Sequence, residues 1–199
     1  MSLPDNVGRD PVTPLRNFKF SRQQHGVTLI EQIMVLAIVT ALTGMAIPSV
    51  RKLLGRNQLQ VAQTDFMAAL RHARETAIVS GKRTLFCPTR DGSRCNDDTR
   101  WDNGWLLGHD ADGDDQPDNR PLYVSQGHSY HGKLIISSTT GRHLVRFHPD
   151  GSASGSNITL LFCQPSNANH TLSVVVSNSG RIRGAPASKN QIASCSQMN

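Results

Sequence analysis

The most constraining feature of this sequence is an apolar run close to the N-terminus. Residues 27–47 read VTLIEQIMVLAIVTALTGMAI and carry a single charge, that of Glu31. A helix of about 20 apolar residues is long enough to cross the hydrocarbon core of a bilayer. Four basic residues and only two acidic ones precede the run, which predicts a cytoplasmic N-terminus. No A-x-A-like site follows it, and it is longer than the core of a secretory signal peptide, so we expect a membrane helix that stays in the chain.

Glu31 requires a partner or a function, because a carboxylate inside a membrane helix costs roughly 2.5–3.5 kcal/mol on insertion scales. The nearest candidate partner is the α-amino group that cutting the chain after Gly26 would create. The segment from Gly26 to Glu31, GVTLIE, resembles the prepilin processing site of type IV pilins and type II secretion pseudopilins. The resemblance implies that a prepilin peptidase of the inner membrane cuts after Gly26 and that Val27 is then N-methylated. It also implies that Glu31 neutralises the N-terminal amine of a neighbouring subunit during filament assembly.

Pro48 matches the proline that commonly bends the helix in this family, since proline removes one hydrogen bond of the helical ladder. Two residues depart from the family pattern. Val27 stands where Phe is preferred, and His25 stands where Lys or Arg is usual. Both departures would slow processing without changing the interpretation.

Past Pro48 the pattern predicts that the helix continues to Ser80, with Gly81 ending it. Apolar residues at spacings of three and four form one face of this part: Leu59, Ala62, Phe66, Ala69, Ala73 and Ala77. Beyond Gly81, short apolar segments between Gly, Pro, Asn and Asp turns predict strands over residues 83–87, 104–109, 134–137, 143–148, 158–163 and 172–177. In the last of these the even positions form the expected core face.

The predicted fold class is therefore α+β, with a long N-terminal helix packed on a C-terminal head of antiparallel β-sheet. Its expected parts are a leader peptide (1–26), a transmembrane segment (27–48), an amphipathic continuation (49–80) and a periplasmic β-rich head (81–199). The expected location is the bacterial inner membrane before assembly and the tip of a filament afterwards.

Four cysteines in a head that faces the oxidising periplasm favour two disulfides. A zinc site is the alternative, but the chain has no C-x-x-C pair. Three pairings are possible. We prefer Cys87 with Cys95, which closes a short loop, and Cys163 with Cys195, which ties the C-terminal tail to a strand.

Several motifs in the head narrow the family. They are the pair Cys87 and Cys95, the segment WDNGW at 101–105, the acidic loop 110–114 and the segment SGRIR at 179–183. Together they resemble the GspH/FimT group of minor pilins, and FimT most of all. The resemblance implies a place among other minor and major pilins at a filament tip. Some FimT members bind DNA for natural transformation through a Gly-Arg-x-Arg motif, which stands here at Gly180, Arg181, Ile182 and Arg183.

The charge distribution supports an anionic partner for the C-terminal third. Residues 87–118 hold nine acidic residues and three Arg, whereas residues 133–199 hold six Lys or Arg and the single Asp150. On a strand, Arg181 and Arg183 would point the same way and could grip successive phosphates of double-stranded DNA. Further basic residues would extend the patch if the fold brings them near: Lys133, Arg142, Arg146 and Lys189. Such binding would be indifferent to base sequence and sensitive to salt.

Two alternatives remain open for this motif. The arginines could simply protect an edge strand from aggregation. The protein could also be a GspH-type pseudopilin of the type II secretion system with a purely structural role at the tip, touching only other proteins.

The acidic loop allows a calcium interpretation, in which Asp110, Asp112 and Asp114 alternate around Gly113. The motif is incomplete as an EF-hand, and a solvated turn of Asp side chains explains it as well. We expect no cofactor and no enzymatic activity, because the chain has no nucleophile elbow, phosphate loop or zinc-binding HExxH motif. Trp101 and Trp105 are expected to be core residues.

Overall fold

The computed structural model describes residues 26–126, 130, 132–139, 141–165 and 170–198. The leader expected over residues 1–26 therefore lies outside the described residues, apart from Gly26. The chain divides into two compact units, residues 1–45 and 46–199, and each is described by itself. Helix α1 (Leu29–Ser80) begins in the first unit and ends in the second.

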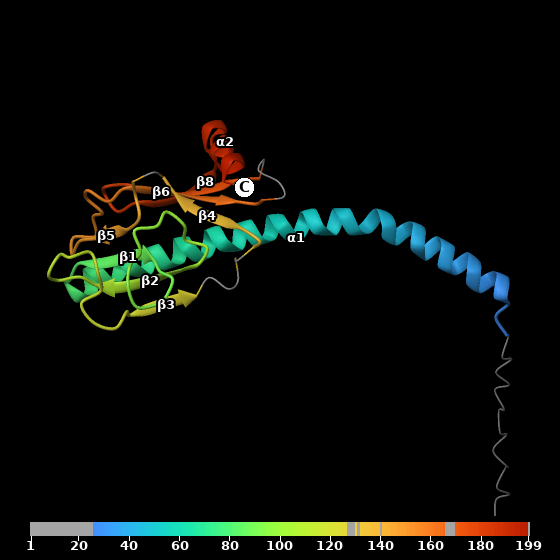
Figure 1. Ribbon diagram of the computed structural model, residues 1–199, viewed down its shortest axis with the longest axis horizontal. Helices are drawn as coiled ribbons and strands as arrows, with labels where there is room; N and C mark the ends of the chain where they lie inside the picture. The colour runs from blue at the N-terminus through green and yellow to red at the C-terminus, as the bar shows by residue number, and fades with distance from the viewer. Residues whose placement is uncertain (1–25, 127–129, 131, 140, 166–169, 199) are drawn as a thin grey trace, which may run out of the picture. The chain divides into compact units, whose positions relative to one another are not determined.

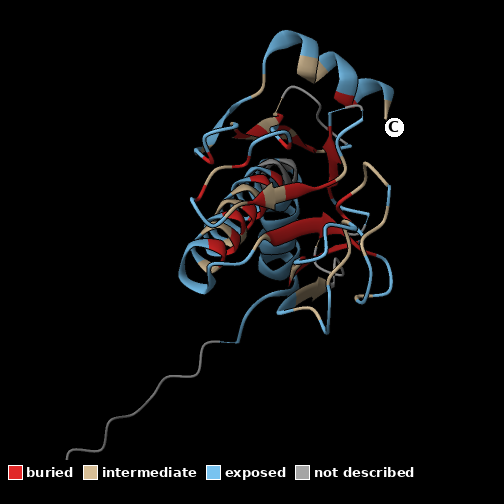
Figure 2. Cartoon of the chain, turned by 90° about the vertical axis from the view of Figure 1, so that its left-hand side faces the viewer, coloured by how far each residue is buried: buried red, intermediate tan, exposed pale blue. Residues whose placement is uncertain are grey.

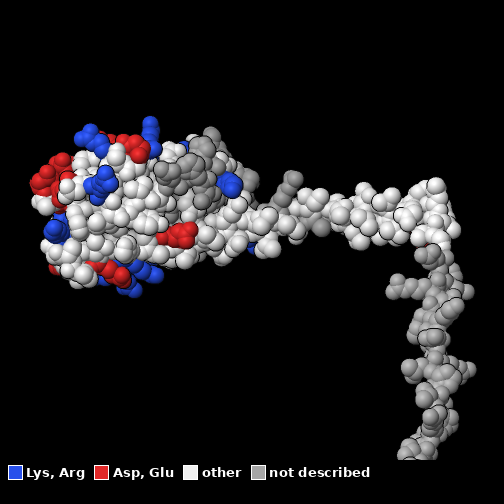
Figure 3. All heavy atoms as spheres, turned by 90° about the horizontal axis from the view of Figure 1, so that it is seen from below, with Lys and Arg blue, Asp and Glu red and all other residues white. Residues whose placement is uncertain are grey.

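In the first unit, residues 26–28 are not helical and α1 then begins at Leu29. The large apolar side chains of this part of α1 are exposed: Leu29, Ile30, Ile33, Met34, Val35, Leu36, Ile38, Val39 and Leu42. On the face drawn in Figure 3, this part of α1 shows only uncharged residues. Across the described parts of the chain, no helix combines the length and the apolar character needed to cross a membrane.

The described part of the second unit contains two four-stranded antiparallel sheets (Figure 1). The first has the order β3-β2-β1-β5, and the second has the order β4-β6-β7-β8. Their strands are β1 (Thr84–Pro88), β2 (Gly104–His109), β3 (Tyr123–Gln126), β4 (Ile135–Ser138), β5 (Val145–Phe147), β6 (Ile158–Cys163), β7 (Leu172–Val176) and β8 (Ile182–Pro186). A short helix, α2 (Lys189–Gln197), follows the last strand.

The second half of α1 packs on both sheets through one buried stripe (Figure 2). The stripe consists of Leu59, Ala62, Phe66, Leu70, Ala73 and Ala77, all buried. It confirms the predicted apolar face, with Leu70 buried and its neighbour Ala69 only partly so. Amphipathic periodicity therefore determines which side of the helix meets the head.

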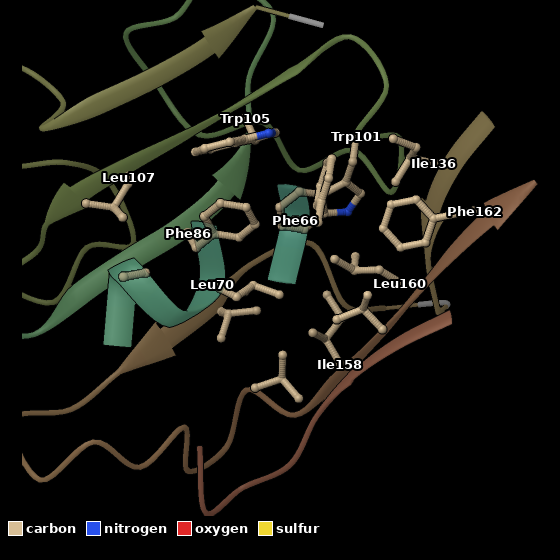
Figure 4. Packing of buried hydrophobic residues seen from close by; sticks show 14 of the residues in the cluster. Phe66, Leu70, Phe86, Trp101, Trp105, Leu107, Ile136, Ile158, Leu160 and Phe162 are labelled. Atoms are coloured by element: carbon tan, nitrogen blue, oxygen red, sulfur yellow. The ribbon is translucent and has the colours of Figure 1, made fainter. Parts of the chain in front are cut away.

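Phe66 lies at the centre of the core, among aromatic rings from both sheets (Figure 4). Its ring packs in an edge-to-face arrangement against three other rings. The distances between ring centroids are 6.1 Å to Phe86, 6.0 Å to Trp105 and 5.3 Å to Phe162. Trp101 and Trp105 are buried, as expected from the sequence.

The second sheet is covered on both faces, by α1 on one and by α2 on the other, as the side chains of β6 show. These side chains alternate, so Leu160 and Phe162 face α1 whereas Leu161 and Cys163 belong to a separate cluster with Cys195 of α2. Helix α2 begins with a capping box, in which the Ser188 hydroxyl accepts from the Gln191 N–H and the Gln191 side chain accepts from the Ser188 N–H.

The two disulfides join Cys87 to Cys95 and Cys163 to Cys195, with Cα–Cα distances of 5.5 and 5.7 Å. This is the pairing preferred from the sequence. The shorter one closes the loop after β1, and the longer one fastens α2 to β6.

The six predicted strands are present, most of them shifted or shortened by one or two residues at an end. Two strands and one helix were not predicted as elements: β3, β8 and α2. Strand β8 reads IRGAP, which has little intrinsic strand preference, and it forms because it pairs along its whole length with β7.

Candidate functional site

The Gly-Arg-x-Arg motif begins in the tight turn between β7 and β8. The N–H of Gly180 donates to the carbonyl of Ser177 at 2.8 Å, and the N–H of Ser177 donates to the carbonyl of Arg181 at 3.0 Å. Gly180 has φ +74°, in the left-handed region that favours glycine. The glycine of the motif is therefore required by the turn itself.

Gly180 also lies against a second turn, at Gly151. A Cβ atom added to Gly180 would lie 1.9 Å from the Gly151 carbonyl oxygen. The same oxygen accepts a hydrogen bond of 2.8 Å from Nε of Arg74 on α1. Helix α1, the turn at Gly151 and the β7–β8 turn thus meet at one carbonyl group.

A hollow of about 430 Å³ opens beside this meeting point. It is lined by Arg71, Arg74, Glu75, Ser179, Gly180, Arg181 and Ile182, and we call it the arginine hollow. Arg71 and Arg181 are exposed, and within the described part of the chain neither guanidinium group donates a hydrogen bond or joins an ion pair. Three guanidinium groups against one carboxylate make the hollow suited to an anion.

The structure groups the basic residues differently from the sequence prediction. Arg183 is exposed on β8, opposite Val175, and does not line the arginine hollow. None of the four residues expected to extend the patch lines it either: Lys133, Arg142, Arg146 and Lys189. Two of these four are engaged elsewhere, as Arg142 donates to the Gly155 carbonyl at 2.9 Å and Arg146 binds the carboxylate of Asp115.

Arg71 and Arg74 are the residues that sequence reasoning missed. They are three positions apart on α1, so they lie on neighbouring positions of one helix face. That spacing was a usable signal, but nothing in the sequence tells which strand or turn this face meets.

Among the described residues, four of the nine acidic residues in the segment 87–118 form ion pairs with arginines. The described ion pairs with arginine are Arg83–Asp110, Arg90–Asp98, Arg100–Asp102 and Arg146–Asp115. Basic and acidic side chains also lie next to each other on the head in Figure 3. The hydrogen bonds from Arg146 lower the pKa of Asp115 below its ordinary value of 3.8. The charge of Arg146 is therefore committed to this loop.

The residues of the calcium interpretation are held mainly by turn hydrogen bonds. Asp110 is buried against Arg83 and accepts from the Gly113 N–H at 2.8 Å, and Asp114 accepts from the Gln116 N–H at 2.8 Å. Among the described residues, the carboxylates that approach one another belong to Asp110, Asp112 and Asp118, not to Asp114. The predicted set is thus not assembled, and the turn interpretation accounts for the hydrogen bonds.

Residues of the predicted processing site are accessible. Gly26 is exposed, a Cβ atom added to it would meet no atom within 4 Å beyond its chain neighbours, and Val27 is 59% exposed. Glu31 stands in the first turn of α1, and Pro48 lies within α1 in the second unit.

Comparisons with known proteins found a matching family model and similar solved structures. The model of the family described as "Type II transport protein GspH" matches residues 62–180. Among solved structures, the type IV minor pilin FimU of Pseudomonas aeruginosa superposes with a TM-score of 0.55 at 22% identity, covering 66% of this chain and 90% of that one. The minor pseudopilin EpsH of the Vibrio cholerae type 2 secretion system gives 0.46 at 12% identity, covering 65% and 97%. No curated protein matches the chain. The FimU likeness shows a shared fold, and the family match ends at Gly180, just before Arg181.

Proposed function

The chain belongs to the GspH family of minor pilins and pseudopilins, and from that premise we propose that it joins the tip of a type IV pilus and binds double-stranded DNA there for natural transformation. The observation that carries the DNA part of this proposal is the arginine hollow. Arg181 of the Gly-Arg-x-Arg motif stands in it with a guanidinium group that has no partner among the described residues. Guanidinium groups bind phosphate through pairs of parallel hydrogen bonds.

Binding of this kind needs no contact with the bases. Each phosphate neutralised by Arg releases condensed counterions, so affinity falls steeply with salt and is nearly independent of sequence. Arg183, exposed on β8 two residues after Arg181, extends the proposed contact beyond the hollow.

The assembly part of the proposal rests on the N-terminal unit. We propose that prepilin peptidase cuts between Gly26 and Val27 and that Val27 is methylated. We further propose that residues 27–48 anchor the chain in the inner membrane until Glu31 and Pro48 take their places in the filament. The exposed apolar side chains of the first part of α1 support this, because they need lipid or neighbouring subunits to cover them. Mass spectrometry of the protein isolated from its host tests it directly, since an intact N-terminus would contradict processing.

The DNA proposal is tested with the full-length protein in a mild detergent. We expect wild-type protein to bind a labelled DNA duplex at low salt with an affinity that falls steeply as salt rises. The double variant Arg181→Ala/Arg183→Ala should bind much more weakly. The variant Arg94→Ala/Arg120→Ala removes the same charge from exposed positions outside the arginine hollow and should bind nearly as well as wild type. Absence of wild-type binding at low salt would contradict the proposal.

A second candidate is a structural tip subunit of the type II secretion system. It is favoured by the family description, which names a type II transport protein. The two candidates separate in the host. If the DNA proposal holds, Arg181→Ala/Arg183→Ala abolishes DNA uptake while pili still form. If the secretion system is the right one, deleting the gene blocks protein secretion and leaves DNA uptake intact.

A further inference from the structure

We propose that Arg71 is a phosphate-binding residue of the arginine hollow and that Arg74 is a positioning residue that holds the two walls of the hollow together. This inference rests on the proposed DNA binding and extends it from the C-terminal motif to helix α1. It identifies the site as the space between α1 and the β7–β8 turn rather than the motif alone.

Arg71 and Arg74 differ in what their guanidinium groups already do. Arg74 is half-buried, and its Nε donates to the Gly151 carbonyl at 2.8 Å. Arg71 is exposed one turn earlier on the same helix and has no partner among the described residues. Arg71 is therefore free to bind a ligand, whereas Arg74 is engaged in the architecture of the hollow.

The hydrogen bond of Arg74 fixes the wall that carries Arg181. The Gly151 carbonyl that accepts from Arg74 is also the group against which Gly180 packs. Gly180 immediately precedes Arg181 in the turn. Losing the Arg74 bond would release this carbonyl and, with it, the position of the turn.

The charge of the hollow favours a phosphodiester over a neutral ligand. Glu75 is the one carboxylate in its lining, and it forms no ion pair with Arg71 in the described structure. The order Arg then Glu at a spacing of four is the weaker orientation for such a pair on a helix. Arg71 thus keeps its positive charge available beside that of Arg181, and a phosphate between the two walls can accept from both.

The test uses full-length protein in mild detergent with a labelled DNA duplex, titrated with salt. We expect Arg71→Ala to weaken binding by roughly threefold or more and to reduce the salt slope by about 1, as for one lost phosphate contact. The matched control Arg120→Ala removes one charge from an exposed position outside the hollow and should leave the slope unchanged. Both variants should melt at the wild-type temperature, because both side chains are exposed.

The test of Arg74 must report the position of the β7–β8 turn as well as the affinity for DNA. We expect Arg74→Met, which has no donor, to speed hydrogen exchange at the Gly180 amide, which is bonded to Ser177, and to weaken DNA binding in parallel. Arg74→Gln, whose Nε2 can donate in place of the arginine Nε, should restore part of both, and Arg71→Ala should leave this exchange rate unchanged.

The outcomes separate this inference from the proposal on which it rests. If Arg71→Ala binds DNA like Arg120→Ala while Arg181→Ala/Arg183→Ala loses binding, the role of Arg71 is overturned and DNA binding stands. If Arg74→Met weakens binding with no change in exchange at Gly180, its positioning role is overturned. If wild-type protein does not bind the duplex at low salt, both the inference and the DNA proposal fail.

Discussion

Gly180 combines two constraints that can be measured separately. Its φ of +74° excludes most side chains, and its close approach to the Gly151 carbonyl leaves no room for a Cβ atom. Gly155 has nearly the same φ, +76°, but no atom within 4 Å of the place where its Cβ would be. The two glycines therefore form a natural pair for comparison.

We expect Gly155→Ala to lower the free energy of unfolding by about 1 kcal/mol, the usual cost of a positive φ. Gly180→Ala should lower it by roughly 2–3 kcal/mol, because the turn must also move away from Gly151. Urea denaturation of both variants measures the difference. Equal losses would show that the contact with Gly151 contributes nothing to stability.

The ion pair between Asp115 and Arg146 predicts a specific dependence of stability on pH. The hydrogen bonds of Asp115 with Arg146 lower its pKa in the folded state below the ordinary 3.8. The stabilisation is thus complete above the unfolded pKa and is lost as the pH falls through the folded pKa. Asp115 also has a positive φ, 66°, which Asn tolerates, so Asp115→Asn removes the charge without adding backbone strain.

We expect Asp115→Asn to be less stable than wild type at pH 7 and the gap to close as the pH falls well below 3.8. Asp114→Asn is the control, since its side-chain oxygen can still accept from the Gln116 N–H and no arginine pairs with it among the described residues. Thermal melts of the three proteins from pH 7 to pH 2 check this. A gap that persisted at the lowest pH would rule out the ion pair as its origin.

At the scale of elements, α2 depends on its attachment to the second sheet. It has nine residues, too few for a stable isolated helix, and the residue that packs it on the sheet is Cys195, which lies in a buried cluster with Leu161 and Cys163 of β6. Disulfide Cys163–Cys195 closes a segment with a sequence separation of 32, against 8 for Cys87–Cys95. The longer disulfide should therefore stabilise the fold more.

We expect Cys163→Ser/Cys195→Ser to lower the free energy of unfolding by roughly 3–4 kcal/mol on the chain-entropy account. Amides of α2 should also exchange faster, because the helix loses its fastening. Cys87→Ser/Cys95→Ser should leave exchange in α2 unchanged. Hydrogen exchange measured by mass spectrometry distinguishes the two variants, and unaltered protection of α2 in the first would contradict this view of the disulfide.

At the scale of the whole molecule, Phe66 joins α1 to both sheets. It is completely buried, and its ring meets rings from β1, β2 and β6. A cavity at this point would loosen the helix from both sheets at once, since the large rings around it cannot all move in to fill the space.

We expect Phe66→Ala to lower the free energy of unfolding by about 3–5 kcal/mol. Val79→Ala, which shortens a side chain that is 87% exposed on the same helix, should be close to neutral. Urea denaturation compares the two. Similar losses would mean that Phe66 is not the centre of the packing.

Local patterns in the sequence were sufficient to predict most of the fold. The stripe from Leu59 to Ala77 predicted which face of α1 is buried, because helical period and apolar spacing are properties of the chain alone. Alternation predicted the core positions Val174 and Val176, and turn residues bounded the strands. Strand β8 was missed because its stability comes from its partner β7 and not from its own residues.

The sequence by itself determined the helix, the alternating strands and the Gly-Arg-x-Arg turn, since each depends on residues close together in the chain. The tertiary structure alone decided which charges meet. It pairs Arg146 with Asp115, 31 positions away, and brings Arg71 and Arg74 of α1 to Arg181, more than 100 positions later. Charged side chains interact through space, and the sequence around one of them does not identify its partner. The residues that line the arginine hollow could therefore be learned only from the fold.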